Sequence, residues 1–223
     1  MSSAAEQRQA VIDIRDLTEA EIAAFMLELR EASPSSIQDA LQDVLPQLVD
    51  EYGGMAATLG ADWYDEMRDA AGARGRFRAE PIRQPGPARY EAVARWGVDP
   101  LRLDAPNFDA ALERVSSATS RIVGRAHSLT VVQNTRVDPQ AKGWRRIGNG
   151  GTCRFCRMLI DRGAVYRKDS ATFKSHYHCK CTAAPAWDAG REVQTVAYVA
   201  SQRRVTDRDR ARVRAWLDAN YPE

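Results

Sequence analysis

The four cysteines of this chain form two close pairs, and their spacing constrains the fold more than any other feature. Cys153 and Cys156 make a Cys-Arg-Phe-Cys motif, and Cys179 and Cys181 lie in the segment His-Tyr-His-Cys-Lys-Cys that begins at His176. A Cys-x-x-Cys turn places two thiolates on one side of the chain, where both can bind one ion through sulfur–metal bonds of about 2.3 Å. The sequence therefore predicts a metal centre whose ligands all lie within 29 residues.

Zinc is the metal that these donors indicate, because thiolate and imidazole groups are typical ligands of structural zinc sites. Six donors are available for four tetrahedral positions. The first cysteine pair is the preferred one. The second pair projects to one face of an extended segment, and His176 could replace one of its members across a turn. His178 is the weakest candidate, and which four donors bind stays open. The expected ligands come from Cys153, Cys156, His176, Cys179 and Cys181.

Other interpretations of the cysteines are weaker. A disulfide framework is typical of secreted chains and of more widely spaced cysteines, and reduced thiols that merely pack in a core do not account for the clustering. A catalytic zinc keeps one position open for water beside an acid or base. The nearest carboxylates, Asp161 and Asp169, lack the spacing of zinc-hydrolase or deaminase motifs. We therefore expect a closed structural site.

The remaining catalytic motifs are weak as well. Cys179 and His127 could form a nucleophile pair, but a metal-bound cysteine is not a free nucleophile, and we expect His127 to lie on the polar face of a helix. No serine has a Gly-x-Ser-x-Gly context. The glycine-rich segment 148–151 lacks the lysine and hydroxyl residue of a phosphate-binding loop. The sequence therefore supplies no catalytic residue, and we expect no enzyme.

The charge is divided unevenly along the chain, although the 223 residues carry a net charge of only +2. Residues 1–71 carry 15 acidic and 4 basic side chains, whereas residues 140–181 carry 10 basic and 2 acidic ones. The basic segment could follow a phosphate backbone through Arg145, Arg146, Arg154 and Arg157, and the acidic half could bind basic protein surfaces. Alternatively, the halves partly neutralise each other or only keep the surface soluble.

No run of about 18 apolar residues occurs, and the N-terminal residues do not place a charged region before an apolar one. We therefore expect neither a membrane span nor a signal peptide, and a protein that is kept in a cytoplasm.

Hydrophobic periodicity predicts a helical N-terminal half. Thr18 and Glu21 have capping-box spacing for a helix from about residue 18 to 31, and Ser33-Pro34 begins the next helix. Pro46 should kink or split that second helix. Asn107 caps a third helix, which we expect to end near residue 134 and to be the longest uninterrupted one.

The expected fold is mostly α, with a helical N-terminal half, a long central helix and a small α+β zinc knuckle near the C-terminus. Residues 71–106 are rich in glycine, proline and arginine, which predicts a connector with an extended arm and a short helix near residues 90–96. A short strand is expected at residues 164–166 and a tail helix from Thr206. The expected divisions are a helical region (1–70), the connector (71–106), a domain with the long helix and the knuckle (107–187) and a helical tail (188–223).

The segment around the cysteines resembles the MuF-like minor head proteins of tailed bacteriophages. The resemblance rests on Cys-Arg-Phe-Cys-Arg-Met-Leu at 153–159, Gly-Ala-Val-Tyr at 163–166, Phe173, and His-Tyr-His-Cys-Lys-Cys-Thr-Ala-Ala-Pro at 176–185. Upstream, residues 48–52, 61–68 and 138–144 resemble the versions found in phages of actinobacteria. The likeness spans roughly residues 37–187.

This resemblance implies a virion component that acts in head morphogenesis, located in the capsid interior or at the portal vertex after assembly in the host cytoplasm. Its implied partners are the portal protein, the major capsid protein and, through the basic segment 140–181, packaged DNA. Some family members are labelled capsid maturation proteases, which makes a protease the main alternative, beside a zinc-dependent nucleic-acid-binding module. The sequence shows no serine–histidine or acidic-dyad pattern to support a protease.

Overall fold

The computed structural model describes residues 2–148, 153–164, 166–167, 172–175, 179–188 and 206–221. These residues are mostly helical and include one small antiparallel sheet, which confirms the expected fold class. The elements in chain order are α1 (Ala4–Glu28), α2 (Pro34–Ala70), α3 (Pro87–Val98), the 3₁₀ turn η1 (Asp99–Arg102), α4 (Phe108–Val137), β1 (Gly143–Ile147), α5 (Arg154–Asp161), β2 (Tyr166–Arg167), β3 (Thr182–Ala186) and α6 (Asp207–Asn220).

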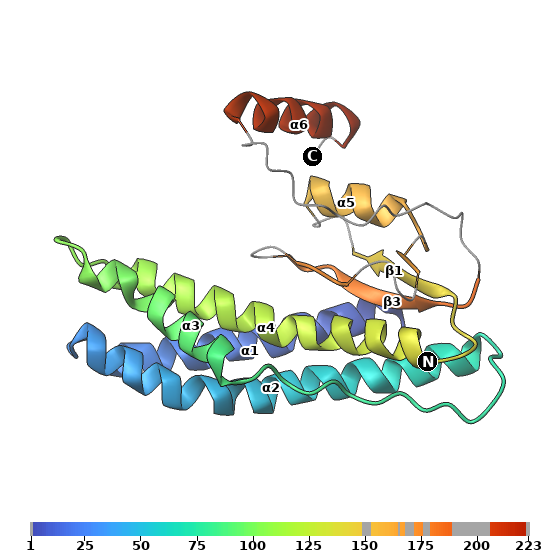
Figure 1. Ribbon diagram of the computed structural model, residues 1–223, viewed down its shortest axis with the longest axis horizontal. Coiled ribbons are helices and arrows are strands. Elements are labelled where there is room, and N and C mark those ends of the chain that lie inside the picture. The colour runs from blue at the N-terminus through green and yellow to red at the C-terminus, as the bar shows by residue number, and fades with distance from the viewer. Residues whose placement is uncertain are drawn as a thin grey trace.

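Three long helices, α1, α2 and α4, lie lengthwise beside one another and form an elongated bundle (Figure 1). Helix α3 packs on α2 and α4. The sheet lies against the C-terminal half of α4, and α6 contacts α5 on the side away from the bundle. No helix in the described ranges is long and apolar enough to cross a membrane.

Two hydrophobic clusters hold these elements together. The first lies inside the bundle and is built from aliphatic side chains such as Ile22, Met26, Leu41, Leu45 and Val115. The second joins the C-terminal halves of α2 and α4 to the sheet; its main members are Trp63, Tyr64, Val131, Trp144, Phe173, Cys156, Cys179 and Cys181. Three of the four cysteines are therefore part of a core rather than of a surface loop.

Helix α1 begins 14 residues earlier than the sequence predicts. Ser3 and Glu6 form a capping box at its start: the Ser3 hydroxyl accepts from the Glu6 backbone N–H at 3.2 Å, and the Glu6 carboxylate accepts from the Ser3 N–H at 2.6 Å. The predicted start at Thr18 is wrong. Thr18 is buried inside the helix, and its hydroxyl donates to the Ile14 carbonyl at 2.8 Å. Val11, Ile12 and Ile14 precede Thr18 and are buried, which stabilises the longer helix.

Helix α2 begins as predicted, with Ser33 as N-cap and Pro34 in the first turn. A kink or a split was expected at Pro46, and the split is wrong, because the helix continues through Pro46 to Ala70. Leu41, Leu45 and Val49 lie on both sides of the proline and are all buried, and this burial offsets the missing backbone hydrogen bond. At 37 residues α2 is also longer than the 30-residue α4, which was expected to be the longest helix.

The connector between α2 and α3 contains no helix or strand over residues 73–86, and polar side chains of the neighbouring helices fix its backbone. The Asn134 side chain accepts from the Glu80 N–H at 2.9 Å and donates to the Glu80 carbonyl at 2.8 Å. Thr130 accepts from the Ile82 N–H, and Asp65 accepts from the Ala79 N–H. The extended arm thus lies along α4. The short helix expected near residues 90–96 is confirmed as α3.

The sheet has the order β2-β1-β3, with both pairs antiparallel. In the longer pair, Gly143 lies opposite Ala186 and Ile147 opposite Thr182. Strand β3 is buried along its whole length, and its small alanines allow it to pack closely on α4. The Ala183 N–H donates to the Ser128 hydroxyl of α4 at 3.2 Å. A short strand was expected at 164–166, and β2 is found at Tyr166–Arg167.

Candidate metal centre

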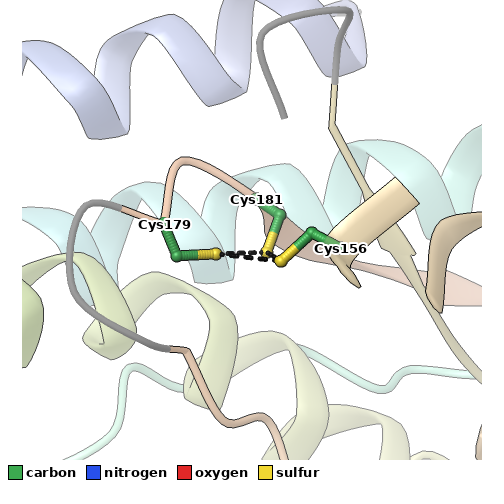
Figure 2. Close-up of side chains that lie close together, drawn as sticks. All are labelled: Cys156, Cys179 and Cys181. Carbon is green, nitrogen blue, oxygen red and sulfur yellow. Dashed lines mark hydrogen bonds between the residues drawn. The ribbon is translucent and has the colours of Figure 1, made fainter. Parts of the chain in front are cut away.

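Three of the four cysteines meet in the interior of the protein (Figure 2). The sulfur atoms of Cys156, Cys179 and Cys181 all lie within 4.8 Å of one another, and the three residues are buried. The Sγ–Sγ distances are 3.4 Å for Cys156–Cys179, 3.6 Å for Cys156–Cys181 and 2.8 Å for Cys179–Cys181. Thiolates on one tetrahedral zinc ion lie about 3.8 Å apart, given bonds of about 2.3 Å. Two of the distances are already close to this value, and the third would have to widen.

Short-range structure explains how these sulfurs meet. Cys179 and Cys181 alternate along the extended segment that leads into β3, so their side chains project to the same side. Cys156 lies in the first turn of α5, which follows the neighbouring strand β1 and contacts it. The pairing of β1 with β3 therefore brings α5 to the second cysteine pair.

The other predicted ligands have different positions. Cys153 is exposed at the N-cap of α5 and is not part of the three-sulfur cluster. It precedes Cys156 by three residues, a spacing that makes side chains neighbours on a helix. His176 lies outside the described residues, as do His178 and the carboxylate of Asp169. Three of the five expected ligands are thus together, and the fourth ligand stays a prediction with Cys153 and His176 as its candidates.

Arg146 contacts the cluster directly and was not predicted to do so. Its Nη1 donates to Cys181 Sγ at 2.9 Å and its Nη2 to the Lys174 carbonyl at 2.9 Å, and its guanidinium lies 4.2 Å from the centre of the Phe173 ring. Burial acts to lower the pKa of Arg146, but the neighbouring Cys181, Cys156 and Tyr166 together outweigh burial and raise it. This buried cation favours negative charge on the sulfurs. The assignment of Arg146 to a DNA-facing surface is therefore wrong.

Two further arginines hold the loop that carries the second cysteine pair. Arg15 of α1 donates to the Cys179 carbonyl at 2.6 Å, and Arg125 of α4 donates to the Phe173 carbonyl at 3.2 Å. Arg15 reaches the loop by passing over Gly124, where a Cβ atom would lie only 2.5 Å from Arg15 Cδ. The cysteine loop is thus attached by charged hydrogen bonds to α1 and α4.

The thiols resist ionisation in this crowded setting. Hydrogen bonds with Cys179 and Cys181, together with burial, raise the pKa of Cys156. The hydrogen bond with Cys156 acts to lower the pKa of Cys181, but the hydrogen bond with Cys179 and burial outweigh it and raise that pKa to about 11. A bound cation reverses this effect, because it compensates the charge of several thiolates at once. The buried, sulfur-rich donor set is therefore suited to a soft or borderline metal ion.

His127 does not lie on a polar face, and that expectation is wrong. It is fully buried, and its ring stacks on Trp63 with the ring centres 5.6 Å apart. Within the described ranges neither ring nitrogen has a hydrogen-bond partner, so the nucleophile pair with Cys179 is not formed. Burial lowers the pKa of His127 to about 4. Helix α4 packs against α1, α2, α3 and β3 and is therefore covered on most sides.

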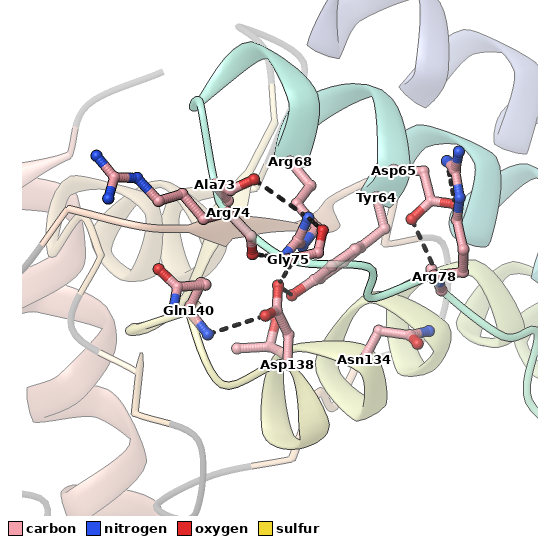
Figure 3. Close-up of polar contacts among 12 residues, drawn as sticks. Tyr64, Asp65, Arg68, Ala73, Arg74, Gly75, Arg78, Asn134, Asp138 and Gln140 are labelled. Carbon is pink, nitrogen blue, oxygen red and sulfur yellow. Dashed lines mark hydrogen bonds and ion pairs between the residues drawn. The ribbon is translucent and has the colours of Figure 1, made fainter.

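A second buried polar group lies where α2 and α4 end (Figure 3). Arg68 Nε donates to Asp138 Oδ2 at 3.0 Å, and the Tyr64 hydroxyl donates to the same oxygen at 3.1 Å. The Arg68 guanidinium also donates to the carbonyls of residues 73, 74 and 75. The other Asp138 oxygen accepts from the Gln140 N–H at 2.9 Å. These contacts fix the turns that lead from α2 into the connector and from α4 towards β1, so we assign the group a structural role.

A family model described as VG15 protein matches residues 1–206, which is most of the chain. The family is associated with phages. No curated protein and no solved structure matches the chain significantly.

Proposed function

We propose that this chain, which belongs to the phage-associated VG15 protein family, is a non-enzymatic minor head protein that takes part in head morphogenesis. Its family supports a phage protein, and the finer proposal relies on the MuF-like residues around the cysteines. The observation that carries it is that three of these residues, Cys156, Cys179 and Cys181, form a cluster of sulfurs inside the second hydrophobic core. This position in a core supports a structural role for the cluster.

Structural zinc is the metal that we propose for this cluster. Helix α5 has eight residues and the sheet has strands of two and five residues, which is too little to fold alone. An ion held by Cys156, Cys179 and Cys181, with Cys153 or His176 as fourth ligand, would link α5 to the segment before β3. Thiolate-rich donor sets favour zinc among the common divalent ions of the cell.

The charge distribution supports a protein partner more than DNA. Of the four arginines considered for DNA, Arg146 is buried, Arg154 forms an ion pair with Asp218, and Arg157 donates to the Tyr221 carbonyl. By contrast, the acidic side chains of α1 and α2 are mostly exposed: Asp13, Asp16, Glu21, Glu28, Asp39, Asp43, Asp50, Glu51, Asp62 and Asp69. We therefore infer that the helical half docks on a basic surface of the portal or major capsid protein, in the virion interior.

Mass spectrometry of purified virions and procapsids tests the role. We expect few copies of the chain per particle. When the chain is co-expressed with the portal or the major capsid protein, we expect the two proteins to co-purify. Charge reversal of Asp39, Asp43 and Asp50 on α2 should weaken this co-purification, whereas reversal of the basic Arg208 and Arg212 on α6 should not. Absence of the chain from both particles would rule out a head protein.

A direct incubation addresses the protease alternative. The purified chain is mixed with the matching major capsid protein, and the products are followed by mass spectrometry. Our proposal predicts an intact capsid protein. Cleavage at a defined bond that survives purification, and that one substitution in this chain abolishes, would replace the proposal with the protease.

Metal analysis tests the site separately from the role. We expect about one equivalent of zinc in protein purified without chelators, and strong loss of zinc in Cys156→Ser and Cys181→Ser. Comparison of Cys153→Ser with His176→Ala then identifies the fourth ligand. Less than half an equivalent of zinc in carefully purified protein would refute the site while leaving the head-protein role open.

A further inference from the structure

A cavity of about 320 Å³ opens between the connector and α4, and neither the fold nor the metal centre accounts for it. Its floor is aliphatic and is formed mainly by Ile82, Ile122 and Leu129. This volume is at the lower end of the range of ligand sites, which are commonly apolar concave surfaces with a few convergent polar groups. The cavity therefore has the size for a large side chain or a small ligand.

Three arginines, Arg83, Arg89 and Arg125, also line the cavity, and no lining residue is acidic. Within the described ranges, neither Arg83 nor Arg89 has an ion-pair partner. The pKa of Arg125 is lowered by burial and by the charges of Arg121 and Arg89. Positive charges are thus gathered at an apolar surface without a compensating carboxylate. An anionic group bound here would relieve their repulsion.

Gln84 also lines the cavity, but its side-chain amide is buried against Gly53 of α2, where a Cβ atom would lie 2.5 Å from Gln84 Oε1. The arginines therefore supply the charged groups that a ligand in the cavity can reach.

We propose that this cavity is a docking site for a peptide segment of a partner protein, in which a carboxylate stands next to a large aliphatic or aromatic side chain. The side chain occupies the aliphatic floor, and the carboxylate binds Arg83 and Arg89. The proposal does not depend on the head-protein role.

The composition of the lining favours a peptide over nucleic acid. Among the described residues, the lining contains no aromatic side chain on which a base could stack. Its apolar floor instead suits an aliphatic or aromatic side chain, and its arginines suit a carboxylate beside that side chain.

The test uses a set of acetylated and amidated six-residue peptides, in which a Glu–X–Asp unit carries Leu, Ile, Phe or Trp at X, with Gln–X–Asn peptides as neutral controls. Binding to the full chain is measured by nuclear magnetic resonance titration. We expect at least one acidic peptide to bind at least tenfold more tightly than its neutral control, and the double variant R83E/R89E to lose this binding at least tenfold. Arg76 is exposed, lies in the same connector and does not line the cavity, so R76E should bind within about twofold of wild type.

Several results would overturn the proposal. The first is that no acidic peptide binds, or that the acidic and neutral peptides bind equally. The second is that R76E weakens binding as much as R83E/R89E, which would indicate a non-specific charge effect. The third is that inorganic phosphate or a short DNA duplex binds more tightly than every peptide and is sensitive to R83E/R89E, which would make the site a phosphate site.

Discussion

The pair of Arg68 and Asp138 is nearly inaccessible to water, with side-chain exposures of 4% and 0%. Removing such charges from water costs several kcal/mol per ion, and good hydrogen bonding has to offset that cost. Asp138 accepts hydrogen bonds from Tyr64, Arg68 and Gln140, and the guanidinium of Arg68 also donates to backbone carbonyls. The two residues are therefore strongly interdependent, because loss of one leaves the charge of the other buried without a counter-charge.

Neutralising one member of this pair should destabilise the protein strongly. We expect Asp138→Asn and Arg68→Met each to lower the free energy of unfolding by about 3–5 kcal/mol, measured by urea denaturation with circular dichroism. Arg78→Met is the matched control, because Arg78 is 77% exposed in its 3.4 Å pair with Asp65 and should cost less than about 1 kcal/mol. Equal effects of the buried and exposed substitutions would contradict this account.

His127 should make stability fall in mild acid. Burial lowers its pKa to about 4 from an ordinary value of 6.5, so between these values the unfolded chain binds a proton that the folded chain does not. The contribution of the neutral His127 ring to the free energy of unfolding is fully present above pH 6.5. It is lost as the pH falls to about 4, and the loss amounts to up to about 3 kcal/mol. His127→Leu should remove this part of the pH dependence.

Acid also releases metal from thiolates, so wild type and His127→Leu are compared at the same metal content, and the difference between their stability profiles isolates the histidine. Nuclear magnetic resonance gives an independent measurement, in which one of the three histidines should titrate near pH 4. A stability profile that is the same in wild type and His127→Leu, or three histidines that all titrate near pH 6.5, would show that the His127 ring is hydrated.

The helices show which parts of the fold the sequence determines locally. The starts of α2, α4 and α6 were predictable, because Ser33, Asn107 and Thr206 each cap the backbone within three residues. The start of α1 was not, since the same spacing occurs twice, at Ser3 and at Thr18, and tertiary packing decides between them. Pro46 is a similar case, because burial of its neighbours keeps α2 continuous.

Helix α4 was harder to interpret because its apparent polar face is buried. The small polar residues Thr119 and Thr135 donate to carbonyls four residues earlier in the same helix, so they need no water. At the metal centre, cysteine spacing indicated the cluster, but Arg15 reaches it from 164 residues away in sequence. The burial of Arg146, by contrast, was predictable from the local sequence, because Arg146 and Trp144 alternate on the buried side of β1.

The close approach of α2 and α4 depends on one glycine, and two glycine substitutions test it. A Cβ atom at Gly60 would lie 2.8 Å from the His127 carbonyl oxygen, whereas one at Gly54 meets nothing within 4 Å. We expect Gly60→Ala to destabilise the protein by about 1–3 kcal/mol, because the contact is with backbone that cannot rotate away. Gly54→Ala should stabilise it by about 0.5–1 kcal/mol through helix propensity.

Urea denaturation of both variants measures these effects, and far-ultraviolet circular dichroism confirms that the helices are intact. The critical result is that the two substitutions change the free energy of unfolding in opposite directions, because both add the same methyl group to the same helix. Stabilisation by Gly60→Ala would mean that α2 and α4 can separate at this point without loss, and that the crossing is not tightly packed.

The whole molecule consists of a helical bundle and a smaller sheet-and-cysteine region that share α4. The first hydrophobic cluster contains no residue of the sheet, of α5 or of the cysteine loop. The second depends on those elements, and Arg15 and Arg125 attach their loop to the bundle. Metal binding should therefore stabilise one end of the molecule directly and the far end only through α4.

Chelation should accordingly unfold one region and spare the other. In the metal-loaded protein we expect a strong chelator to abolish protection from hydrogen exchange in β1 and β3 and to weaken it in the last turns of α2 and α4, because these segments pack around the cysteines. Protection at Leu41, Leu45 and Val115 should change little. Cys156→Ser should reproduce the pattern without chelator. Uniform loss of protection along the chain would instead show that the bundle cannot fold without the metal. Unchanged protection in β1 and β3 would show that the sulfurs hold the sheet-and-cysteine region by packing alone.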